Sequence, residues 1–250
     1  MSGLLGDYSR QAQTYDDTRA ASPSVLGPLR DALANAPGWR LADVGGGTGN
    51  YSAALVEDGW QPLVLDRSEQ MLTRARAKGL DTLRADAQSL PLEDASFDAA
   101  MLVSMLHHVD DRRLALAEAT RILRPGGRLA VLLFTREDVS DLWFLDLFPS
   151  SRQWMLETHP PLDEVLDSLP GAERVEVVFD DLVDGSVAAL AGCPDRVVDP
   201  GYRGSTSYFE RLANDHPEEL AEGIAWLERQ LEQGTAPSEP GRGSLVVWRR

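Results

Sequence analysis

The sequence predicts an α/β fold in which helices cover both faces of a doubly wound, mostly parallel sheet of seven strands. From Trp39 onward, short apolar runs bounded by acidic or glycine turns alternate with helical patterns. The first such run turns through glycines into a helix, as in Rossmann-like sheets. A length of 250 residues with 43% hydrophobic residues suits a single domain with a sizeable core. We therefore expect right-handed βαβ crossovers.

The individual elements follow from these patterns. Residues up to Pro37 are expected to be helical, because Ser22-Pro23 begins an apolar repeat at helical spacing. The strands are expected at 41–44, 62–65, 82–84, 97–103, 128–134, 172–179 and 244–248. Further helices are expected at 51–57, 69–77, 111–123, 161–169 and 217–233.

Charge and cysteine content narrow the classes of function. The 24 basic and 40 acidic residues give a net charge of −16. This field repels phosphodiester backbones, so no nucleic-acid partner is expected. Cys193 is the only cysteine, which excludes an internal disulfide and a cysteine-rich metal site. We see neither a run of about 18 apolar residues nor a secretory signal, so we expect no membrane partner and a cytoplasmic protein.

The glycine-rich turn Asp43-Val-Gly-Gly-Gly-Thr-Gly49 is the most informative segment. Glycines let the backbone approach a ligand, and the helix that follows presents free N–H groups. The glycine spacing departs from the dinucleotide fingerprint, because position 50 is asparagine, and Asp43 would repel a pyrophosphate. Asp66, at the end of the second strand, can accept both hydroxyls of an adenosine ribose. We therefore expect an adenosine ligand without a pyrophosphate.

Four blocks make the sequence resemble the class I S-adenosylmethionine-dependent methyltransferases, particularly the small-molecule group related to the ubiquinone/menaquinone-biosynthesis enzymes. They are Asp43-Val-Gly-Gly-Gly-Thr-Gly49, Asp66, Ala85-Asp-Ala-Gln-Ser-Leu-Pro91 with Ser96-Phe-Asp98, and Arg121-Ile-Leu-Arg-Pro-Gly-Gly127. The resemblance runs from about Tyr8 to Phe134. It implies S-adenosyl-L-methionine as cofactor, S-adenosyl-L-homocysteine as product, and in-line methyl transfer in a desolvated pocket.

The resemblance also implies which residues bind the cofactor. They are Tyr15, Arg19, Asp43, Gly45, Gly47, Gly49, Asp66, Arg67, Met71, Asp86, Ala87 and Ser104. Asp66 would hold the ribose hydroxyls, and the glycines would lie against the methionyl arm with Asp43 close by. Arg67 and Met71 would flank the adenine. Asp86 and the Ala87 N–H would bind its polar edge, and the Ser104 carbonyl would accept from the methionyl ammonium.

The expected organisation is a single methyltransferase domain over residues 1–250. Within it, residues 1–37 would be an N-terminal helical lid, in which Tyr15 and Arg19 close over the cofactor. Residues 38–136 would be the cofactor-binding core. Segments 137–171 and 185–235 would form a substrate cap, because the strand alternation loosens there.

The candidate catalytic bases are His108 and His107, which follow the fourth predicted strand. Histidine titrates near neutral pH and can take a phenol or amine proton. The adjacent pair cannot easily both chelate, so no metal is expected. His159 and His216 are given no chemistry, because each lies beside a proline in an apparent loop.

The expected acceptor is a small hydrophobic or aromatic molecule. Large side chains are frequent in the two cap segments, where they would line a pocket. They are Trp143, Phe144, Phe148, Trp154, Met155, Tyr202, Tyr208, Phe209 and Trp226. The sequence leaves open whether oxygen, nitrogen or carbon is methylated, and it leaves the oligomeric state open.

Two other classes of function fit the sequence less well, and one alternative stays open. An amino-methylating nucleic-acid enzyme would carry an Asn/Asp-Pro-Pro-aromatic run where this chain has Ser104-Met-Leu-His. A nicotinamide oxidoreductase does not fit the glycine spacing. The alternative that stays open is an S-adenosylmethionine-binding protein or a non-methylating enzyme, such as a cyclase, on the same fold.

Overall fold

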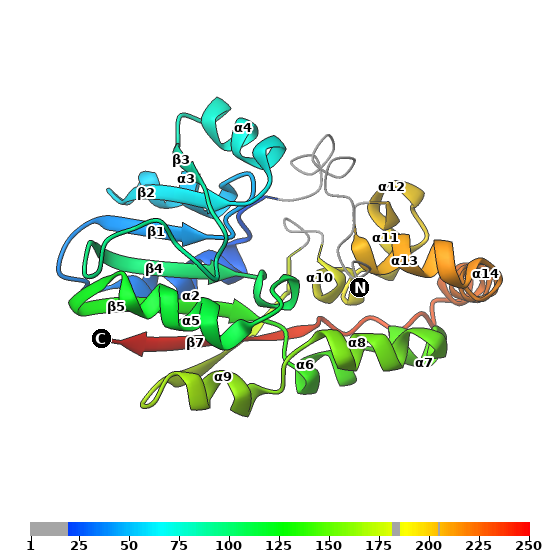
Figure 1. Ribbon diagram of the computed structural model, residues 1–250. Coiled ribbons are helices and arrows are strands. Elements are labelled where there is room, and N and C mark those ends of the chain that lie inside the picture. Colours follow the sequence, from blue (N-terminus) through cyan, green and yellow to red (C-terminus); the bar gives the residue numbers. More distant parts are fainter. Residues whose placement is uncertain (1–19, 182–185, 205) are drawn as a thin grey trace.

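The predicted seven-stranded sheet forms in the order β3-β2-β1-β4-β5-β7-β6 (Figure 1). The computed structural model describes residues 20–181, 186–204 and 206–250. The strands are β1 (Arg40–Val44), β2 (Gln61–Asp66), β3 (Asp81–Arg84), β4 (Phe97–Val103), β5 (Leu123–Leu133), β6 (Glu173–Val178) and β7 (Arg242–Arg249). All seven overlap the ranges expected from the sequence, so the predicted fold class is confirmed.

The strand directions account for the expected mixed character of the sheet. The first five strands pair in parallel, whereas β7 lies antiparallel between β5 and β6. Their order reverses at β1, which pairs with both β2 and β4. Such a reversal leaves a crevice at the carboxyl ends of parallel strands, where doubly wound sheets bind ligands.

Helices cover both faces of the sheet. They are α2 (Pro23–Leu33), α3 (Asn50–Val56), α4 (Glu69–Ala77), α5 (Arg112–Arg121), α6 (Arg136–Ser140), α7 (Phe144–Leu147), α8 (Arg152–Thr158), α9 (Leu162–Ser168), α10 (Val187–Ala191), α11 (Pro194–Val197), α12 (Pro200–Arg203), α13 (Ser207–Asp215) and α14 (Pro217–Gln233), with single 3₁₀ turns at η1 (Leu106–His108) and η2 (Pro149–Ser151). Successive side chains of a strand point to opposite faces of the sheet. The buried side chains of α2, α3 and α4 pack against strand residues of one face, and those of α5 and α9 pack against strand residues of the other face.

Helix α2 belongs to the sheet rather than to a lid. Its residues Val25, Leu29 and Leu33 are almost fully buried against Leu132 of β5 and Leu245 of β7. The described part of the predicted lid, residues 1–37, therefore packs as a covering layer. Tyr15 and Arg19 lie outside the described residues, so their predicted role stays a prediction.

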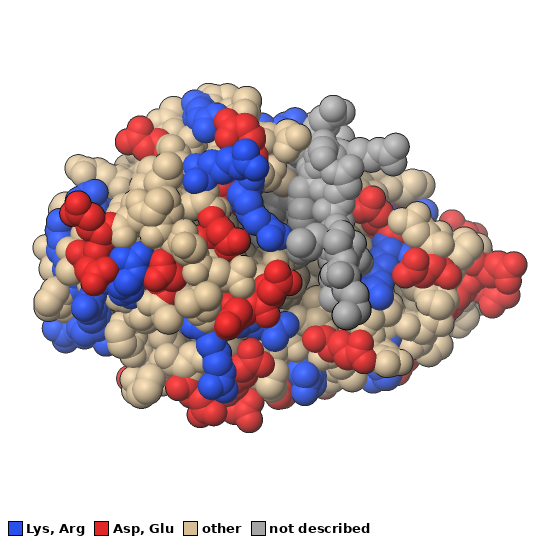
Figure 2. All heavy atoms as spheres, in the orientation of Figure 1, with Lys and Arg blue, Asp and Glu red and all other residues tan. Residues whose placement is uncertain are grey.

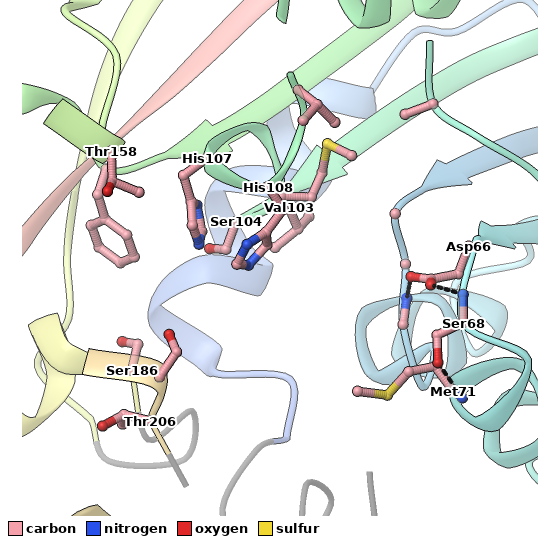
Figure 3. Close-up of a pocket in the computed structure, with 18 of the residues that line it drawn as sticks. Asp66, Ser68, Met71, Val103, Ser104, His107, His108, Thr158, Ser186 and Thr206 are labelled. Carbon is pink, nitrogen blue, oxygen red and sulfur yellow. Dashed lines mark hydrogen bonds between the residues drawn. The ribbon is translucent and has the colours of Figure 1, made fainter. Parts of the chain in front are cut away.

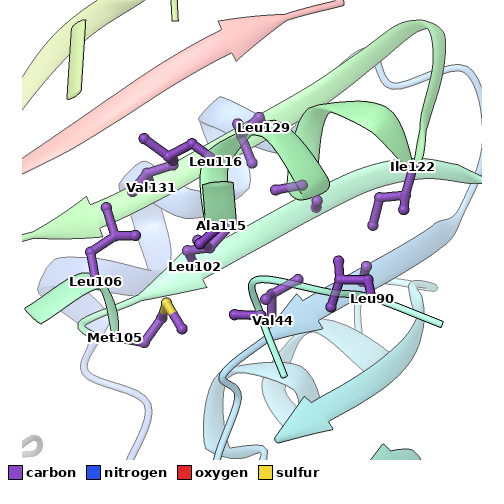
Figure 4. Packing of buried hydrophobic residues seen from close by; sticks show 14 of the residues in the cluster. Val44, Leu90, Leu102, Met105, Leu106, Ala115, Leu116, Ile122, Leu129 and Val131 are labelled. Atoms are coloured by element: carbon purple, nitrogen blue, oxygen red, sulfur yellow. The ribbon is translucent and has the colours of Figure 1, made fainter. Parts of the chain in front are cut away.

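The core under α5 is continuous with the loop that follows β3 (Figure 4). Leu116 of α5 packs with Leu102 of β4 and Leu129 of β5, and Leu90 from the loop joins the same cluster. Arg121 of α5 anchors this loop by donating to the Leu90 carbonyl. The connection between β3 and β4 contains no helix and is fixed in place by these contacts with α5.

The helices outside the sheet have a separate hydrophobic core, built from two distant chain segments. Phe144 and Phe148 of the first segment pack against Phe209 and Leu227 of the second. Glycine at position 223 is required there, because a Cβ would lie 2.3 Å from Cε1 of Phe148. This cluster joins α6, α7 and α8 to α10–α14 in one helical layer, which we call the cap. Helix α9, which lies within the predicted cap segment 137–171, packs instead with α5 on the sheet, because Val165 is buried in that cluster. Among the described residues, no helix is both long and apolar enough to cross a membrane.

Asp138 connects the cap to the sheet. Its carboxylate is 7% exposed and accepts hydrogen bonds from the Thr135 N–H, the Ser244 hydroxyl and the Arg174 guanidinium. Thr135 and Asp138 also form a reciprocal capping box that starts α6. The first cap helix is therefore anchored to β7 and β6 through one buried acid.

Replacing this acid should destabilise the fold. We expect Asp138→Ala to lower the free energy of unfolding by about 3 kcal/mol, because it leaves buried donors and Arg174 without their acceptor. Denaturant unfolding followed by circular dichroism measures this. The control Asp141→Ala, on an exposed acid three residues later, should change the unfolding free energy by less than about 0.5 kcal/mol. Equal effects of the two substitutions would contradict the anchoring role.

Candidate functional site

A cavity of about 1000 Å³ lies at the carboxyl ends of the parallel strands. Residues from β1, β2 and β4 line one part of it, and residues from the cap line the other. Parallel pairing brings these strand ends together, since Asp43 of β1 is in register with Val64 of β2 and Met101 of β4. This volume is at the upper end of the range for small-molecule pockets, of about 300–1,000 Å³.

Asp43 is a buried acid in the wall of this cavity. Its side chain accepts a 2.7 Å hydrogen bond from the Ser52 hydroxyl and is only 2% exposed. Burial raises the pKa of Asp43 to about 7, the Ser52 bond opposes the shift, and the negative charge of Asp66 adds to it. The free protein therefore holds a carboxyl that titrates near neutral pH next to the glycine turn.

Asp66 binds the glycine turn and the start of α4 at the same time. Its Oδ2 accepts from the Gly47 N–H at 3.0 Å, and its Oδ1 accepts from the Ser68 N–H at 2.8 Å. Burial raises the pKa of this carboxyl, and the two N–H groups oppose that shift. Each carboxylate oxygen keeps further lone pairs, so the group can also accept from a ligand.

The three glycines of the turn, Gly45, Gly47 and Gly49, differ in what a side chain at each position would meet. All three have positive φ, which disfavours other residues. Apart from its chain neighbours, no described residue has an atom within 4 Å of where a Cβ of Gly47 would be, and Gly47 lines the cavity. At Gly45 a Cβ would lie 2.8 Å from the Met105 side chain, and at Gly49 it would lie 2.4 Å from Leu80. Gly49 does not line the cavity; it is the N-cap of α3 and allows close packing.

Residues that follow β2 and β3 form one wall of the cavity. Met71 in the first turn of α4 is 4% exposed and lines it, as do Arg67, Asp86 and Ala87. The Asp86 carboxylate accepts from the Gln88 N–H at 2.9 Å, which fixes the turn after β3. A buried thioether beside polar groups of a fixed turn forms a slot for a flat ring with a polar edge.

The segment after β4 carries Ser104 and the two predicted histidines. Ser104 has φ +51°, an uncommon conformation for a residue with a side chain, and its N–H donates to the Leu132 carbonyl. The chain turns sharply there into η1, and the rings of His107 and His108 lie 3.8 Å apart. Figure 3 shows these two rings between Asp66 and Met71 on one side and Thr158, Ser186 and Thr206 on the other.

The cap adds a third histidine, His159, to which the sequence pattern assigned no chemistry. His159 follows α8 and stacks on His107, with ring centroids 5.3 Å apart and an angle of 24° between the planes. It is 7% exposed and lines the cavity. Its neighbour Pro160 suggested a loop, and only the packing of α8 against α6 brings it to this wall.

Most predicted cap aromatics are core rather than cavity lining. Trp154, Met155 and Tyr208 line the cavity. Phe144, Phe148 and Phe209 are fully buried in the cap core, and Trp143 donates its indole N–H to the Ala191 carbonyl. Hydroxyl groups of Thr158, Ser186, Thr206 and Ser207 share the cavity wall. The cap side of the cavity is therefore more polar than the aromatic content of the sequence suggested.

The structure brings most of the predicted site residues together. The predicted residues that line this cavity are Asp43, Gly45, Gly47, Asp66, Arg67, Met71, Asp86, Ala87, Ser104, His107 and His108. Among the described residues, no three histidine, cysteine or acidic side chains lie close enough to hold a metal ion. On the face shown in Figure 2, basic and acidic side chains are interspersed, and acidic ones gather at the end where α14 lies.

Comparisons with known proteins agree with these features. A family model described as a methyltransferase domain matches residues 42–131, which run from β1 to β5. The ubiquinone/menaquinone biosynthesis C-methyltransferase UbiE of Teredinibacter turnerae is 37% identical over 130 residues, 45% of this chain and 52% of that protein. UbiE of Shewanella sp. W3-18-1 is 30% identical over 186 residues, 62% of this chain and 74% of that protein. The first match thus spans about half of the relative.

Solved structures share the fold over most of the chain. A putative methyltransferase from an antibiotic biosynthesis pathway of Anabaena variabilis superposes with a TM-score of 0.78 at 22% identity, covering 92% of this chain and 98% of that one. The [4+2]-cyclase SpnF superposes with a TM-score of 0.56 at 20% identity, covering 90% of this chain and 79% of that one. At these identities the likeness concerns the fold alone.

The family model matches the segment that carries the glycine turn, Asp66 and the two histidines, and this family uses S-adenosyl-L-methionine as methyl donor. The resemblance noted in the sequence is confirmed. The chain belongs to the class I S-adenosylmethionine-dependent methyltransferases and is related to the ubiquinone/menaquinone biosynthesis enzymes.

Proposed function

We propose that this methyltransferase acts on a small hydrophobic or aromatic acceptor, which binds between the sheet edge and the cap. The observation that carries the proposal is the continuity of the cavity from Asp66 and Met71 to the cap residues Thr158 and Tyr208. A cofactor at one end and a small acceptor at the other would share the space next to His107. The C-methyltransferase relatives give the acceptor class a second support, since their names describe quinone biosynthesis.

The cofactor end of the cavity suits an adenosine with a cationic amino-acid arm. At Gly47 a Cβ would point into open space, which is the property of a turn that a ligand approaches closely. Asp66 would hold the ribose hydroxyls, and Arg67 and Met71 would flank the adenine, with Asp86 and the Ala87 N–H at its polar edge. Gly45 and Gly47 would lie along the methionyl arm. These assignments are part of the proposal.

The methionyl end would meet two groups at the ends of β1 and β4. The Ser104 carbonyl would accept a hydrogen bond from the ammonium group, since Ser104 directly follows the end of β4 and lines the cavity. Asp43 would supply the negative charge that a cationic arm requires, with its pKa lowered again by that cation. Tyr15 and Arg19, which lie outside the described residues, are proposed to cover the cofactor.

When bound, S-adenosyl-L-methionine supplies a methyl group activated by a neighbouring sulfonium charge. The chain's own residues contribute by excluding water and by holding the acceptor in line. Apolar side chains of Met105, Phe134, Leu142 and Met155 line the cavity and would limit the water around the methyl group. His108 or His107 would take a proton from an acceptor that carries one.

An acceptor screen tests the proposed function. Purified protein is incubated with S-adenosyl-L-methionine and with phenols, quinones, indoles or amines, and release of S-adenosyl-L-homocysteine is measured together with the methylated product. We expect turnover with at least one hydrophobic aromatic acceptor and none with nucleic acid. Cofactor binding without turnover on any small acceptor, but with rearrangement of a polyene substrate, would favour the cyclase alternative instead.

Asp66 should be required for cofactor binding. We expect Asp66→Ala to raise the Kd for S-adenosyl-L-homocysteine about 10-fold to 150-fold, because the charged acceptor of two ribose hydrogen bonds is lost. Isothermal titration calorimetry measures the Kd, and circular dichroism checks the fold. The matched control is Asp81→Ala, which should leave the Kd unchanged. Asp81 is an exposed acid at the start of β3, at the edge of the sheet away from the cavity. An unchanged Kd in folded Asp66→Ala would remove the ribose assignment.

Asp43 should make cofactor binding depend on pH. With a pKa of about 7 in the free protein, its carboxyl is mostly protonated at pH 6 and must lose the proton to face a cationic arm. We therefore expect the affinity for S-adenosyl-L-methionine to rise by up to about fivefold from pH 6 to pH 7, by up to about tenfold from pH 6 to pH 8, and to level off above pH 8.

The variant Asp43→Asn separates this acid from the nearby histidines. It should bind the cofactor more weakly, with an affinity that varies little between pH 6 and pH 8, while Ser52→Ala should shift the pH midpoint upward, since the Ser52 bond opposes the raised pKa. Calorimetry at several pH values provides both measurements. A pH dependence that persists in Asp43→Asn would assign it to His107 or His108.

A further inference from the structure

His159 has no role in the proposed function so far, and its surroundings differ from those of an ordinary core histidine. Its ring lies between the ring of His107 and that of Phe134, whose centroid is 6.5 Å away at an angle of 72°. It is 7% exposed, and it belongs to the lining of the cavity on the side of the cap. It is thus a buried polar group at the acceptor end.

One ring nitrogen of His159 forms a hydrogen bond with the backbone. Nδ1 lies 2.9 Å from the Met155 carbonyl oxygen, one turn earlier in α8. A carbonyl oxygen only accepts, so the hydrogen must be on Nδ1. In the neutral imidazole the other nitrogen, Nε2, then carries a lone pair and can only accept.

The surroundings keep this ring neutral. Burial lowers the pKa of His159, and the positive charge of Arg112 lowers it further, while the Met155 bond and the charge of Asp138 oppose the shift. Arg112 is fixed beside it, because its guanidinium donates to the Thr158 carbonyl at 2.8 Å and to the Leu106 carbonyl at 3.3 Å. In the described part of the chain, no donor is found for Nε2.

Nε2 is not among the described side-chain atoms that are enclosed without a partner, so it is accessible from the cavity that His159 lines. A hydrogen bond from a ligand donor to such an acceptor contributes about 0.5–1.5 kcal/mol. The lone pair of a neutral imidazole repels carboxylates and phosphates and selects an O–H or N–H group. The neighbouring walls of Phe134, Val139, Leu142 and Met155 favour an uncharged, flat ligand. A hydroxyl group on an aromatic ring satisfies both conditions, since it is neutral near pH 7, whereas an alkylamine is charged there.

We propose that Nε2 of His159 binds the hydroxyl group of an aromatic acceptor and so selects hydroxylated arenes as substrates. The inference rests on the proposed function, because it takes the cap end of the cavity as the acceptor site. His107, stacked on the same ring, lies next to the hydroxyl in this arrangement. The cap thereby supplies the specificity-determining group, and the sheet edge supplies the cofactor site.

Nuclear magnetic resonance of the imidazole nitrogens tests the inference without turnover. The chain has four histidines, so protein labelled with ¹⁵N-histidine gives few signals. For His159 at pH 7.5 we expect a protonated Nδ1 and an unprotonated Nε2, assigned with His159→Asn. In protein saturated with S-adenosyl-L-homocysteine, 2-naphthol should shift the Nε2 signal, and 2-methoxynaphthalene, which has no hydroxyl, should not.

Binding to the variants measures how much the hydroxyl contact matters. His159→Asn keeps an amide that can donate to the Met155 carbonyl but has no group at the position of Nε2. We expect it to bind 2-naphthol about fivefold to tenfold more weakly, with the affinity for 2-methoxynaphthalene changed less than twofold. His216→Asn is the control, because His216 starts α14 and does not line the cavity, and it should change neither affinity.

The outcomes separate this inference from the proposed function. A protonated Nε2, an unmoved signal on 2-naphthol binding, or equal losses for the two naphthalenes in His159→Asn would each overturn the hydroxyl contact. Failure of 2-naphthol to bind the loaded protein would overturn it as well. In all these cases binding of S-adenosyl-L-homocysteine leaves the cofactor site intact, whereas loss of that binding in the unmodified protein would refute the proposed cofactor site itself.

Discussion

The parallel pairing of β1 with β2 on one side and β4 on the other is the constraint on which the site depends. The carboxyl ends of parallel strands all lie at the same edge of the sheet. Asp43, Asp66 and Ser104, which lie at or next to these ends, therefore come together although they are far apart in the sequence. Two hydrogen bonds from backbone N–H groups to Asp66 then fix the glycine turn against the start of α4. The proposed cofactor side is thus built directly on the ends of the sheet strands.

This edge also concentrates features that oppose stability. Burial raises the pKa values of two neighbouring acids, Asp43 and Asp66, and Ser104 adopts a backbone conformation that costs about 1–3 kcal/mol. The core under α5 and the layer of α2 contain ordinary apolar packing and offset these costs. Such a distribution is typical of enzymes, in which a strained, polar site is carried by a well-packed frame.

The proposed acceptor side is built differently, because it depends on contacts between segments far apart in the chain. The cap has its own core, and it meets the sheet through Asp138 and through Arg112, whose guanidinium joins η1 to the end of α8. The stacked rings of His107 and His159 lie at this junction. A shift of the cap would therefore alter the acceptor end without disturbing Asp66 or the glycine turn.

The sequence by itself determined the sheet, the order of its helices and most of the cofactor side. Local patterns are sufficient for these, because strand periodicity, glycine turns and acids at strand ends are adjacent in the chain. It did not distinguish Gly49, which packs on Leu80, from Gly47, which faces the cavity, and it assigned α2 to a lid. Only the tertiary structure decided that Phe144 and Phe209 are cap core and that His159 faces the cavity, since burial in the cap depends on how two distant segments pack against each other.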